Sequence, residues 1–284
     1  MLSELTKTQN GKESFISRHP LTAYFILAYV ISWGLWFSMV ALSLDLKSQP
    51  GSIINGVAIF GPTLAGLMLT PVLAGRVGLL QLFGRLSPSQ PGMRSYVAAI
   101  SLPFLIMIVA LIIGILMGDS FPTNLVGGAW ILPLLAESVR ILFFGGPLGE
   151  EIGWRGFALP RLLSNNSSFK ASLTLGLIWG IWHAPIYFVT GSGQNDMLMS
   201  GGSFAMLFPA FVVWTIGLAV LFTWIYKMTN GNLLITILFH TAVDTAVFFP
   251  SVIGVQSGIV PLLNAGLTWV AAIIVSRTKI FREA

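Results

Sequence analysis

Ionisable residues within apolar stretches are the part of this sequence whose types and spacing could carry out chemistry. Glu150 and Glu151 follow a segment rich in glycine and proline, and His183 and His240 lie in later apolar stretches. Asp244 follows His240 by four residues, which places both on one face of a helix. Carboxylates and imidazoles are common general bases toward water. We therefore predict a hydrolytic site with the catalytic residues Glu150, His183, His240 and Asp244.

The adjacent glutamates of this site are expected to differ in role. Glu151 precedes Arg155 by four residues, so the two share a helix face and form a supporting ion pair. Glu150 falls on a neighbouring face and stays available to accept a proton. The alternative is that both acids are structural. Glu137 and Arg140, three residues apart, are interpreted as a separate ion pair.

Two mechanisms are compatible with these residues. In the first, Glu150 and His183 hold and deprotonate a water that attacks a peptide carbonyl, and His240 stabilises the oxyanion. In the second, Glu150, His183 and His240 bind zinc and leave one coordination position open for the activated water. The first mechanism needs no cofactor and the second needs zinc. The spacing of the residues does not separate them.

The composition places these residues in a membrane. Hydrophobic residues make up 55% of the chain and charged residues 9%, against about 25% charged residues in soluble domains. A single Asp, Lys or Arg at the centre of a membrane helix costs roughly 2.5 to 3.5 kcal/mol, so a buried cluster must be paired or functional. Apolar stretches of about 20 residues cross a bilayer as helices, because backbone groups in lipid must bond within the segment.

About eight such stretches follow one another. We therefore expect an all-α, polytopic integral membrane protein with about eight transmembrane helices in one bundle. Residues 145–149, Gly-Gly-Pro-Leu-Gly, should break the fourth helix, so that Glu150 and Glu151 open a new helical segment near its positive end. The stretches cover approximately residues 21–44, 53–74, 96–117, 130–144, 171–189, 204–226, 233–249 and 259–275.

The charges outside the apolar stretches predict an orientation. Lysines and arginines fall on alternate connections, and short cationic loops stay in the cytoplasm. Both termini are therefore expected on the cytoplasmic side of a bacterial plasma membrane, with residues 1–19 and 277–284 as polar tails and residues 20–276 as the transmembrane bundle. Residues 76–86 are interpreted as a short helix in the membrane interface, with an ordinary loop as the alternative.

Net charge and cysteine content exclude several classes of function. The net charge of +5 fits the orientation and contact with anionic lipid, and it gives no support to nucleic-acid binding. The absence of cysteine excludes a thiol nucleophile, disulfides and a cysteine-ligated metal.

Over residues 130–247, interpreted as a catalytic core, the chain resembles the CAAX-protease and bacteriocin-processing (CPBP) family of intramembrane proteases. The family pattern has two glutamates followed by three residues and an arginine, then an aromatic residue four before a histidine, then a histidine four before an asparagine or aspartate. The chain matches these parts in the same order with Glu150, Glu151 and Arg155, with Trp179 and His183, and with His240 and Asp244.

The resemblance implies an intramembrane endopeptidase in which Glu150 and His183 activate water while His240 and Asp244 form the oxyanion side. An ionised Asp244 cannot donate a hydrogen bond as asparagine does, so we expect it to keep His240 cationic. The implied partners are membrane lipid and a membrane-associated peptide or protein substrate. The alternatives are a non-catalytic scaffold or bacteriocin-immunity factor of the same fold, and a proton-coupled transporter. The sequence leaves the substrate, the oligomeric state and the physiological role open.

Overall fold

The computed structural model describes residues 14–88 and 91–283, and within these residues it contains helices and connections but no strand. The expected all-α class is confirmed. The expected tail over residues 1–19 is described only from Ser14 onward, so its first part lies outside the described residues. The α-helices are α1 (Phe15–Arg18), α2 (Pro20–Ala41), α3 (Gln49–Ile59), α4 (Gly61–Gly84), α5 (Met93–Leu116), α6 (Ile131–Phe144), α7 (Pro147–Gly153), α8 (Leu159–Leu163), α9 (Ser168–Trp182), α10 (Gly193–Met199), α11 (Phe204–Met228), α12 (Leu233–Val252), α13 (Val260–Ser276) and α14 (Lys279–Arg282).

Several of these helices are long and apolar enough to cross a membrane, so the chain is a multi-pass integral membrane protein. Among the described residues, α2, α4, α5, α11 and α12 meet this test, which gives 5 spans. Two bent helix pairs, α6 with the segment Pro147–Leu163 and Ser168–Phe188 with α10, raise the number to 7. The helix α13, with 17 residues, is shorter. The expected number of eight spans therefore stays a prediction.

Two of the expected spans have different limits in the structure. The second stretch, 53–74, is not one helix, because α3 ends at Ile59 and a new helix begins at Gly61 with Pro62 in its first turn. The non-helical Gly75 (φ 60°, ψ −161°) divides α4 into two helical pieces, 61–74 and 76–84, so the short helix expected over 76–86 is present up to Gly84, while its place in the membrane interface stays a prediction. Glycine at Gly75 allows the bend because it has no Cβ.

The fifth stretch, 171–189, also ends earlier as an α-helix than expected. The helix α9 stops at Trp182, His183 is its C-terminal cap, and Ala184–Phe188 form a 3₁₀-helix. Pro185 explains the change, because it has no N–H to donate and disfavours the α conformation in the residue before it. His183 therefore lies at a helix end and not in the middle of a helix.

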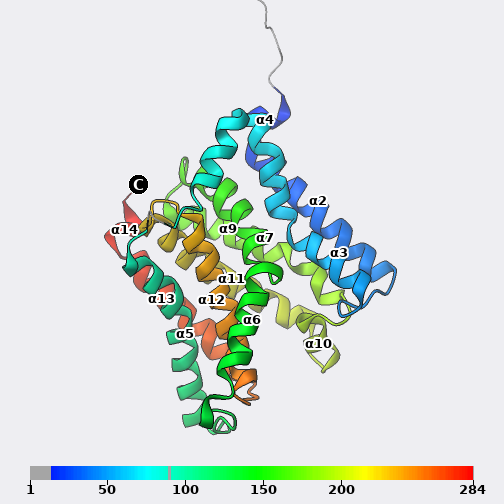
Figure 1. Ribbon diagram of the computed structural model, residues 1–284, viewed down its shortest axis with the longest axis vertical. Coiled ribbons are helices and arrows are strands. Elements are labelled where there is room, and N and C mark those ends of the chain that lie inside the picture. Colours follow the sequence, from blue (N-terminus) through cyan, green and yellow to red (C-terminus); the bar gives the residue numbers. More distant parts are fainter. Residues whose placement is uncertain (1–13, 89–90, 284) are drawn as a thin grey trace, which may run out of the picture.

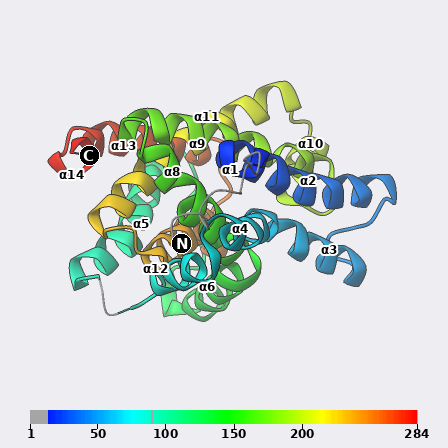
Figure 2. The same ribbon diagram turned by 90° about the horizontal axis from the view of Figure 1, so that it is seen from above.

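The short helix α7 lies at the centre of the bundle. Figure 1 shows α2, α3 and α4 on one side of it and α5, α12 and α13 on the other. The helices α4, α6 and α12 each pack against α7, while α11 packs between α9 and α13. Figure 2 shows the same arrangement from above, with α3 at one end of the molecule and α14 at the other.

Small residues bring α7 close to α4. A Cβ on Gly149 would lie 2.9 Å from a ring atom of Phe60, and one on Gly153 would lie 2.2 Å from the carbonyl oxygen of Pro62. Glycines four residues apart let two membrane helices approach at backbone distance. This close packing fixes the position of Glu150 and Glu151, which lie between the two glycines.

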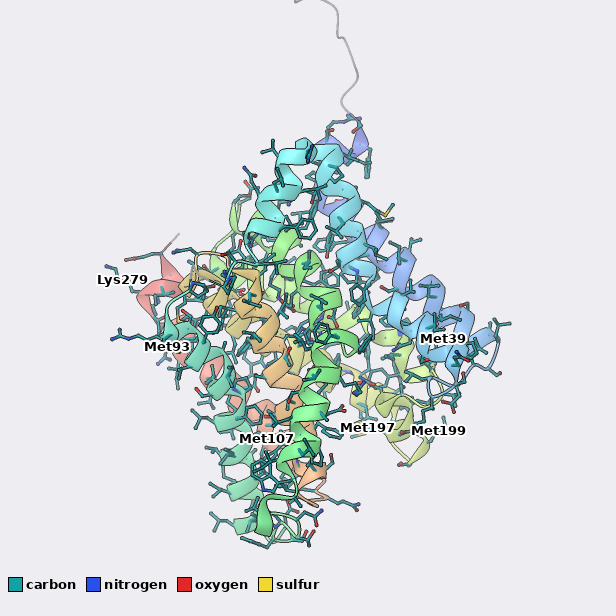
Figure 3. The ribbon with its side chains drawn as sticks, viewed as in Figure 1. Met39, Met93, Met107, Met197, Met199 and Lys279 are labelled. Atoms are coloured by element: carbon teal, nitrogen blue, oxygen red, sulfur yellow. The ribbon has the colours of Figure 1, made fainter. Side chains whose placement is uncertain are left out.

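The interior and the outer surface are both apolar. The largest cluster of buried side chains includes Trp36, Trp154 and Trp182 and extends over both sides of α7. Large hydrophobic side chains also point outward, as Met93 and Met199 do at the edges of the molecule (Figure 3). An apolar exterior is what contact with lipid requires, because lipid offers no partners to polar groups.

Candidate active site

A break between α6 and α7 brings the two glutamates into the bundle. The helix α6 ends at Phe144, Gly146 has a φ of 133°, and Pro147 begins α7. The segments on either side of the break are bent by 41°. The expected break is therefore confirmed, as is the new helical segment that contains Glu150 and Glu151.

A π-helical turn follows α7 directly. It covers Trp154–Ala158 and contains Arg155. This turn was not expected from the sequence. π-Helical turns inside α-helices are rare and occur frequently at functional sites, because they change the direction in which side chains point.

Glu151 connects the side chains of Arg155 and His240 at the centre of the site. Its Oε1 accepts a hydrogen bond from Arg155 Nη1 at 2.7 Å and another from His240 Nδ1 at 2.8 Å. Glu151 and Arg155 are fully buried, and His240 is 4% exposed. The predicted ion pair between Glu151 and Arg155 is confirmed, whereas the bond from His240 was not expected.

Aromatic rings cover the guanidinium of Arg155. Its central carbon lies 3.8 Å from the ring centroid of Phe222 and 4.5 Å from that of Trp179. A desolvated cation above an aromatic face gains about 2 kcal/mol, which offsets part of the cost of burying it. The pair with Glu151 offsets a further part.

Glu150 lies next to this pair but has a different environment. Its Oε2 accepts a hydrogen bond of 2.6 Å from the indole nitrogen of Trp179, and the residue is 4% exposed. Its Oε1 accepts no hydrogen bond from any described residue. A Cβ on Gly146 would lie 2.6 Å from this oxygen and 3.9 Å from His240 Cε1. The free oxygen of Glu150 therefore faces the space that Gly146 leaves beside the His240 ring.

His183 is held by the main chain of its own helix. Its Nδ1 lies 2.8 Å from the carbonyl oxygen of Trp179, to which it donates. The Nε2 lone pair is then available to another group, because a neutral imidazole carries one proton. The half-buried ring packs edge-on against Trp182 and Phe211.

Asp244 lies on the far side of the His240 ring from Glu151. Its Oδ2 is 3.6 Å from His240 Nε2, which is too long for a hydrogen bond but close enough for an ion pair. Asp244 is half-buried. A carboxylate near each ring nitrogen favours the form of His240 with both nitrogens protonated. The other predicted pair, Glu137 with Arg140, is also formed in α6, and Arg140 interacts electrostatically with Asp244.

The described residues contain no group of three or more His, Cys, Asp or Glu side chains arranged to hold one metal ion. The donor set predicted for zinc, Glu150 with His183 and His240, is therefore not preformed.

Arg85 supports the site, although as one of the arginines on alternate connections it was used only to predict the orientation of the chain in the membrane. As the C-terminal cap of α4 it donates to the carbonyl oxygens of Gly231 at 2.8 Å, Gly156 at 3.0 Å and Arg155 at 3.2 Å. Its own carbonyl accepts from Leu233 N at 2.8 Å. Burial lowers the pKa of this guanidinium, which still stays charged. Arg85 thus ties the π-helical turn to the start of α12.

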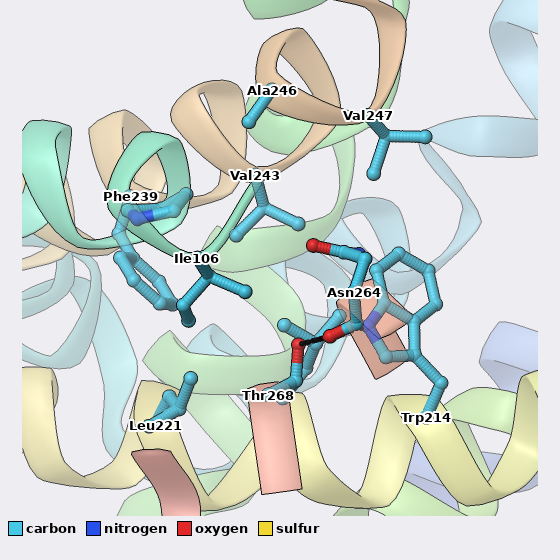
Figure 4. Close-up of a pocket in the computed structure, with 11 residues that line it drawn as sticks. Ile106, Trp214, Leu221, Phe239, Val243, Ala246, Val247, Asn264 and Thr268 are labelled. Carbon is cyan, nitrogen blue, oxygen red and sulfur yellow. Dashed lines mark hydrogen bonds between the residues drawn. The ribbon is translucent and has the colours of Figure 1, made fainter. Parts of the chain in front are cut away.

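A small apolar cavity occupies a different face of α12. Figure 4 shows Phe239, Val243 and Ala246 on one side of it and Asn264 and Thr268 of α13 on the other. The site residues of α12, His240 and Asp244, are not among the residues that line it. No acidic, basic or histidine side chain lines this cavity, so the chemistry belongs to the polar cluster around Glu150.

Comparison with known proteins agrees with the geometry. Residues 129–246 match the family model described as "Type II CAAX prenyl endopeptidase Rce1-like". The chain is also 24% identical over 226 residues to CAAX prenyl protease 2 of Methanococcus maripaludis, a match that covers 78% of this chain and 81% of that relative. The matched family segment contains all the predicted site residues. These findings support an endopeptidase rather than the scaffold or transporter alternatives.

Proposed function

We propose that this chain, whose residues 129–246 match the Rce1-like family model, is an intramembrane endopeptidase in which Glu150 activates the water that cuts its substrate. The observation that carries this proposal is the contrast between two adjacent acids. Glu151 Oε1 is bonded to both Arg155 and His240 and its Oε2 is buried without a partner among the described residues, whereas the oxygen of Glu150 that accepts no bond from these residues faces the space beside Gly146 and His240. A general base needs such a free oxygen.

The substrate that we propose is a membrane-associated protein whose C-terminal Cys-a-a-X sequence carries a prenyl group. The relative from Methanococcus maripaludis supports this choice, because that protein is a CAAX prenyl protease. A site inside the bundle suits such a substrate, since the lipid chain holds the peptide at the membrane.

The proposed reaction begins with a water bound to Glu150 Oε1 and the free nitrogen of His183. Glu150 takes one proton from this water while the water oxygen forms a bond to the peptide carbonyl carbon. The C–N bond then breaks, and Glu150 passes the proton to the departing nitrogen. The products are a new carboxylic acid and a new amine, and transfer of the acid proton to the amine gives a carboxylate and an ammonium group, so atoms and charges balance.

In this proposal His240 stabilises the oxyanion. It lies beside the free oxygen of Glu150, and the carboxylates of Glu151 and Asp244 face its ring nitrogens. A cationic imidazole stabilises the negative oxygen that develops in the transition state. Asp244 acts through His240 by charge, because its distance from the ring is longer than a hydrogen bond.

We propose the metal-free route over the zinc route because the described side chains do not form a three-ligand group. Metal analysis of purified active protein tests this choice. We expect cleavage to persist after treatment with a chelator. Loss of cleavage in the chelator, with recovery on addition of zinc, would contradict it.

The test of Glu150 uses an internally quenched peptide with a farnesylated cysteine fourth from its C-terminus, presented to the protein in liposomes. Glu150→Gln should lower the cleavage rate by at least about 10²-fold with the melting temperature retained. The matched control is Glu283→Gln, which changes an exposed acid paired with Lys279 and should leave the rate within about twofold of wild type. Normal cleavage by folded Glu150→Gln protein would overturn the assigned role.

The substrate class has its own test. The same peptide without the farnesyl group should be cut much more slowly at equal concentration, because it lacks the anchor that keeps it at the membrane. Equal rates for the two peptides would contradict the prenylated substrate while leaving the role of Glu150 intact. A comparison of protein termini in membranes that contain wild type or Glu150→Gln then names natural substrates.

A further inference from the structure

Trp179 contacts the side chains of Glu150, Arg155, His183 and His240 at the centre of the site. Its indole N–H donates to Glu150 Oε2 at 2.6 Å, and the Arg155 guanidinium lies 4.5 Å from its ring centroid. The rings of His183 and His240 pack edge-on against it, with centroids 5.7 and 5.5 Å away. The side chain is 3% exposed.

The contact with Glu150 makes the two carboxylate oxygens different. Oε2 is occupied by the indole N–H, whereas Oε1 faces Gly146 and the edge of the His240 ring. A hydrogen bond from a neutral donor to a carboxylate is charge-assisted and therefore stronger than a neutral one. This hydrogen bond restricts rotation of the Glu150 carboxylate, so that only Oε1 faces the water.

We propose that Trp179 is a positioning residue that aligns the general base Glu150 through its indole N–H. This inference rests on the function proposed above for Glu150. The main chain of the same residue aligns the second water-binding group, because its carbonyl oxygen accepts from His183 Nδ1. One residue thus fixes the carboxylate oxygen and the imidazole nitrogen that face the water.

The chemistry of the donor distinguishes this role from simple packing. Phenylalanine at position 179 would keep an aromatic ring beside Arg155 and both histidines but would have no N–H for Glu150. If the indole only fills space, loss of the N–H changes little. If it aligns Glu150, the loss frees the carboxylate to rotate and lowers the rate of the chemical step.

The experiment compares Trp179→Phe with Trp224→Phe, using the farnesylated peptide and full-length protein in liposomes. Trp224 is a matched control because its indole nitrogen is buried and has no partner among the described residues. We expect Trp179→Phe to lower kcat by about 10- to 100-fold with KM within about twofold of wild type. Trp224→Phe should leave both constants within about twofold.

A double-mutant cycle separates positioning from general loss of structure. In the Glu150→Gln background, Trp179→Phe should lower the remaining cleavage by less than about twofold, because the group through which it acts is gone. An equal fold-loss in both backgrounds would show a structural role and overturn the inference. If Trp179→Phe fails to fold, incorporation of benzothienylalanine at position 179 keeps the ring and replaces only the N–H by sulfur.

The outcomes keep the two proposals distinguishable. A folded Trp179→Phe or benzothienylalanine protein with wild-type kcat overturns the role of Trp179, provided that Glu150→Gln is inactive. Normal cleavage by Glu150→Gln, or no cleavage of the peptide by wild type, overturns the proposed function and this inference with it.

Discussion

His240 and Glu151 are joined by a hydrogen bond of 2.8 Å between Nδ1 and Oε1, although they lie 89 residues apart in the chain. The bond connects α12 to α7 across the centre of the bundle. Because the same oxygen also accepts from Arg155, Glu151 holds both side chains in place. The adjacent Glu150 makes neither of these bonds, and its Oε1 faces the space beside Gly146 and the His240 ring.

The Glu151–Arg155 pair should contribute strongly to stability. Arg155→Ala leaves a fully buried carboxylate without its guanidinium, which typically costs about 3 to 5 kcal/mol. We expect a large drop in melting temperature in detergent, or failure to accumulate folded protein. Lys279→Ala is the control, because Lys279 forms an exposed pair with Glu283 and points away from the bundle (Figure 3). A melting temperature of Arg155→Ala equal to that of this control would contradict the assignment.

Asp244 should matter less than His240 for cleavage. Asp244→Asn removes a carboxylate that lies 3.6 Å from the imidazole, but the 2.8 Å contact with Glu151 remains on the other ring nitrogen. We expect cleavage to fall by about tenfold, which corresponds to ~1.4 kcal/mol. His240→Ala should lower it by at least about 10²-fold. Equal losses in the two variants would mean that Asp244 takes a direct part in the reaction.

Gly146 should be required for activity more than for folding. A Cβ at this position would lie 2.6 Å from Glu150 Oε1, and the φ of 133° is strained for any residue with a side chain. In Gly146→Ala the carboxylate has to move, so we expect a rate loss of at least about tenfold with a smaller fall in melting temperature. Gly56→Ala in α3, where a Cβ meets nothing within 4 Å, is the control. Full activity of folded Gly146→Ala would show that Glu150 Oε1 is not the reacting oxygen.

Arg85 should stabilise the site because its guanidinium donates three hydrogen bonds, from Nε, Nη1 and Nη2. Arg85→Lys retains the charge but cannot reach the carbonyl oxygens of Gly231, Gly156 and Arg155 together. Hydrogen bonds from charged groups contribute about 1.5 to 3 kcal/mol, and we expect the free energy of unfolding to fall by an amount in this range. The measurement is the thermal unfolding curve, whose midpoint should move to a lower temperature. Arg94→Lys, at an exposed arginine, should leave the midpoint unchanged.

The predicted orientation is testable because the chain has no cysteine of its own. Ser164→Cys lies in a connection expected in the cytoplasm, and Ser200→Cys lies at the end of α10 in a connection expected outside; both positions are exposed. A membrane-impermeant maleimide should label Ser200→Cys in intact cells and Ser164→Cys only after the membrane is opened. The reverse pattern would invert the topology predicted from the positive charges.

Local rules account for the parts of the fold that the sequence predicts well. The apolar stretches predict membrane helices, and the glycine and proline of residues 145–149 predict the break before α7. The spacing of four residues predicts the Glu151–Arg155 pair. Two spans have wrong limits, because Pro62 and Pro185 end or restart helices within continuous apolar stretches. Hydropathy does not distinguish one apolar helix from two.

The sequence by itself determined that this chain lies in a membrane and which costly residues need a partner, because hydropathy and spacing along one helix are local properties. Only the tertiary structure decided which partners they have. Trp179 reaches Glu150 over 29 residues and His240 reaches Glu151 over 89, both through the packing of separate helices. Contacts of this kind depend on crossing angles and close approach at glycines such as Gly153, which no local pattern contains.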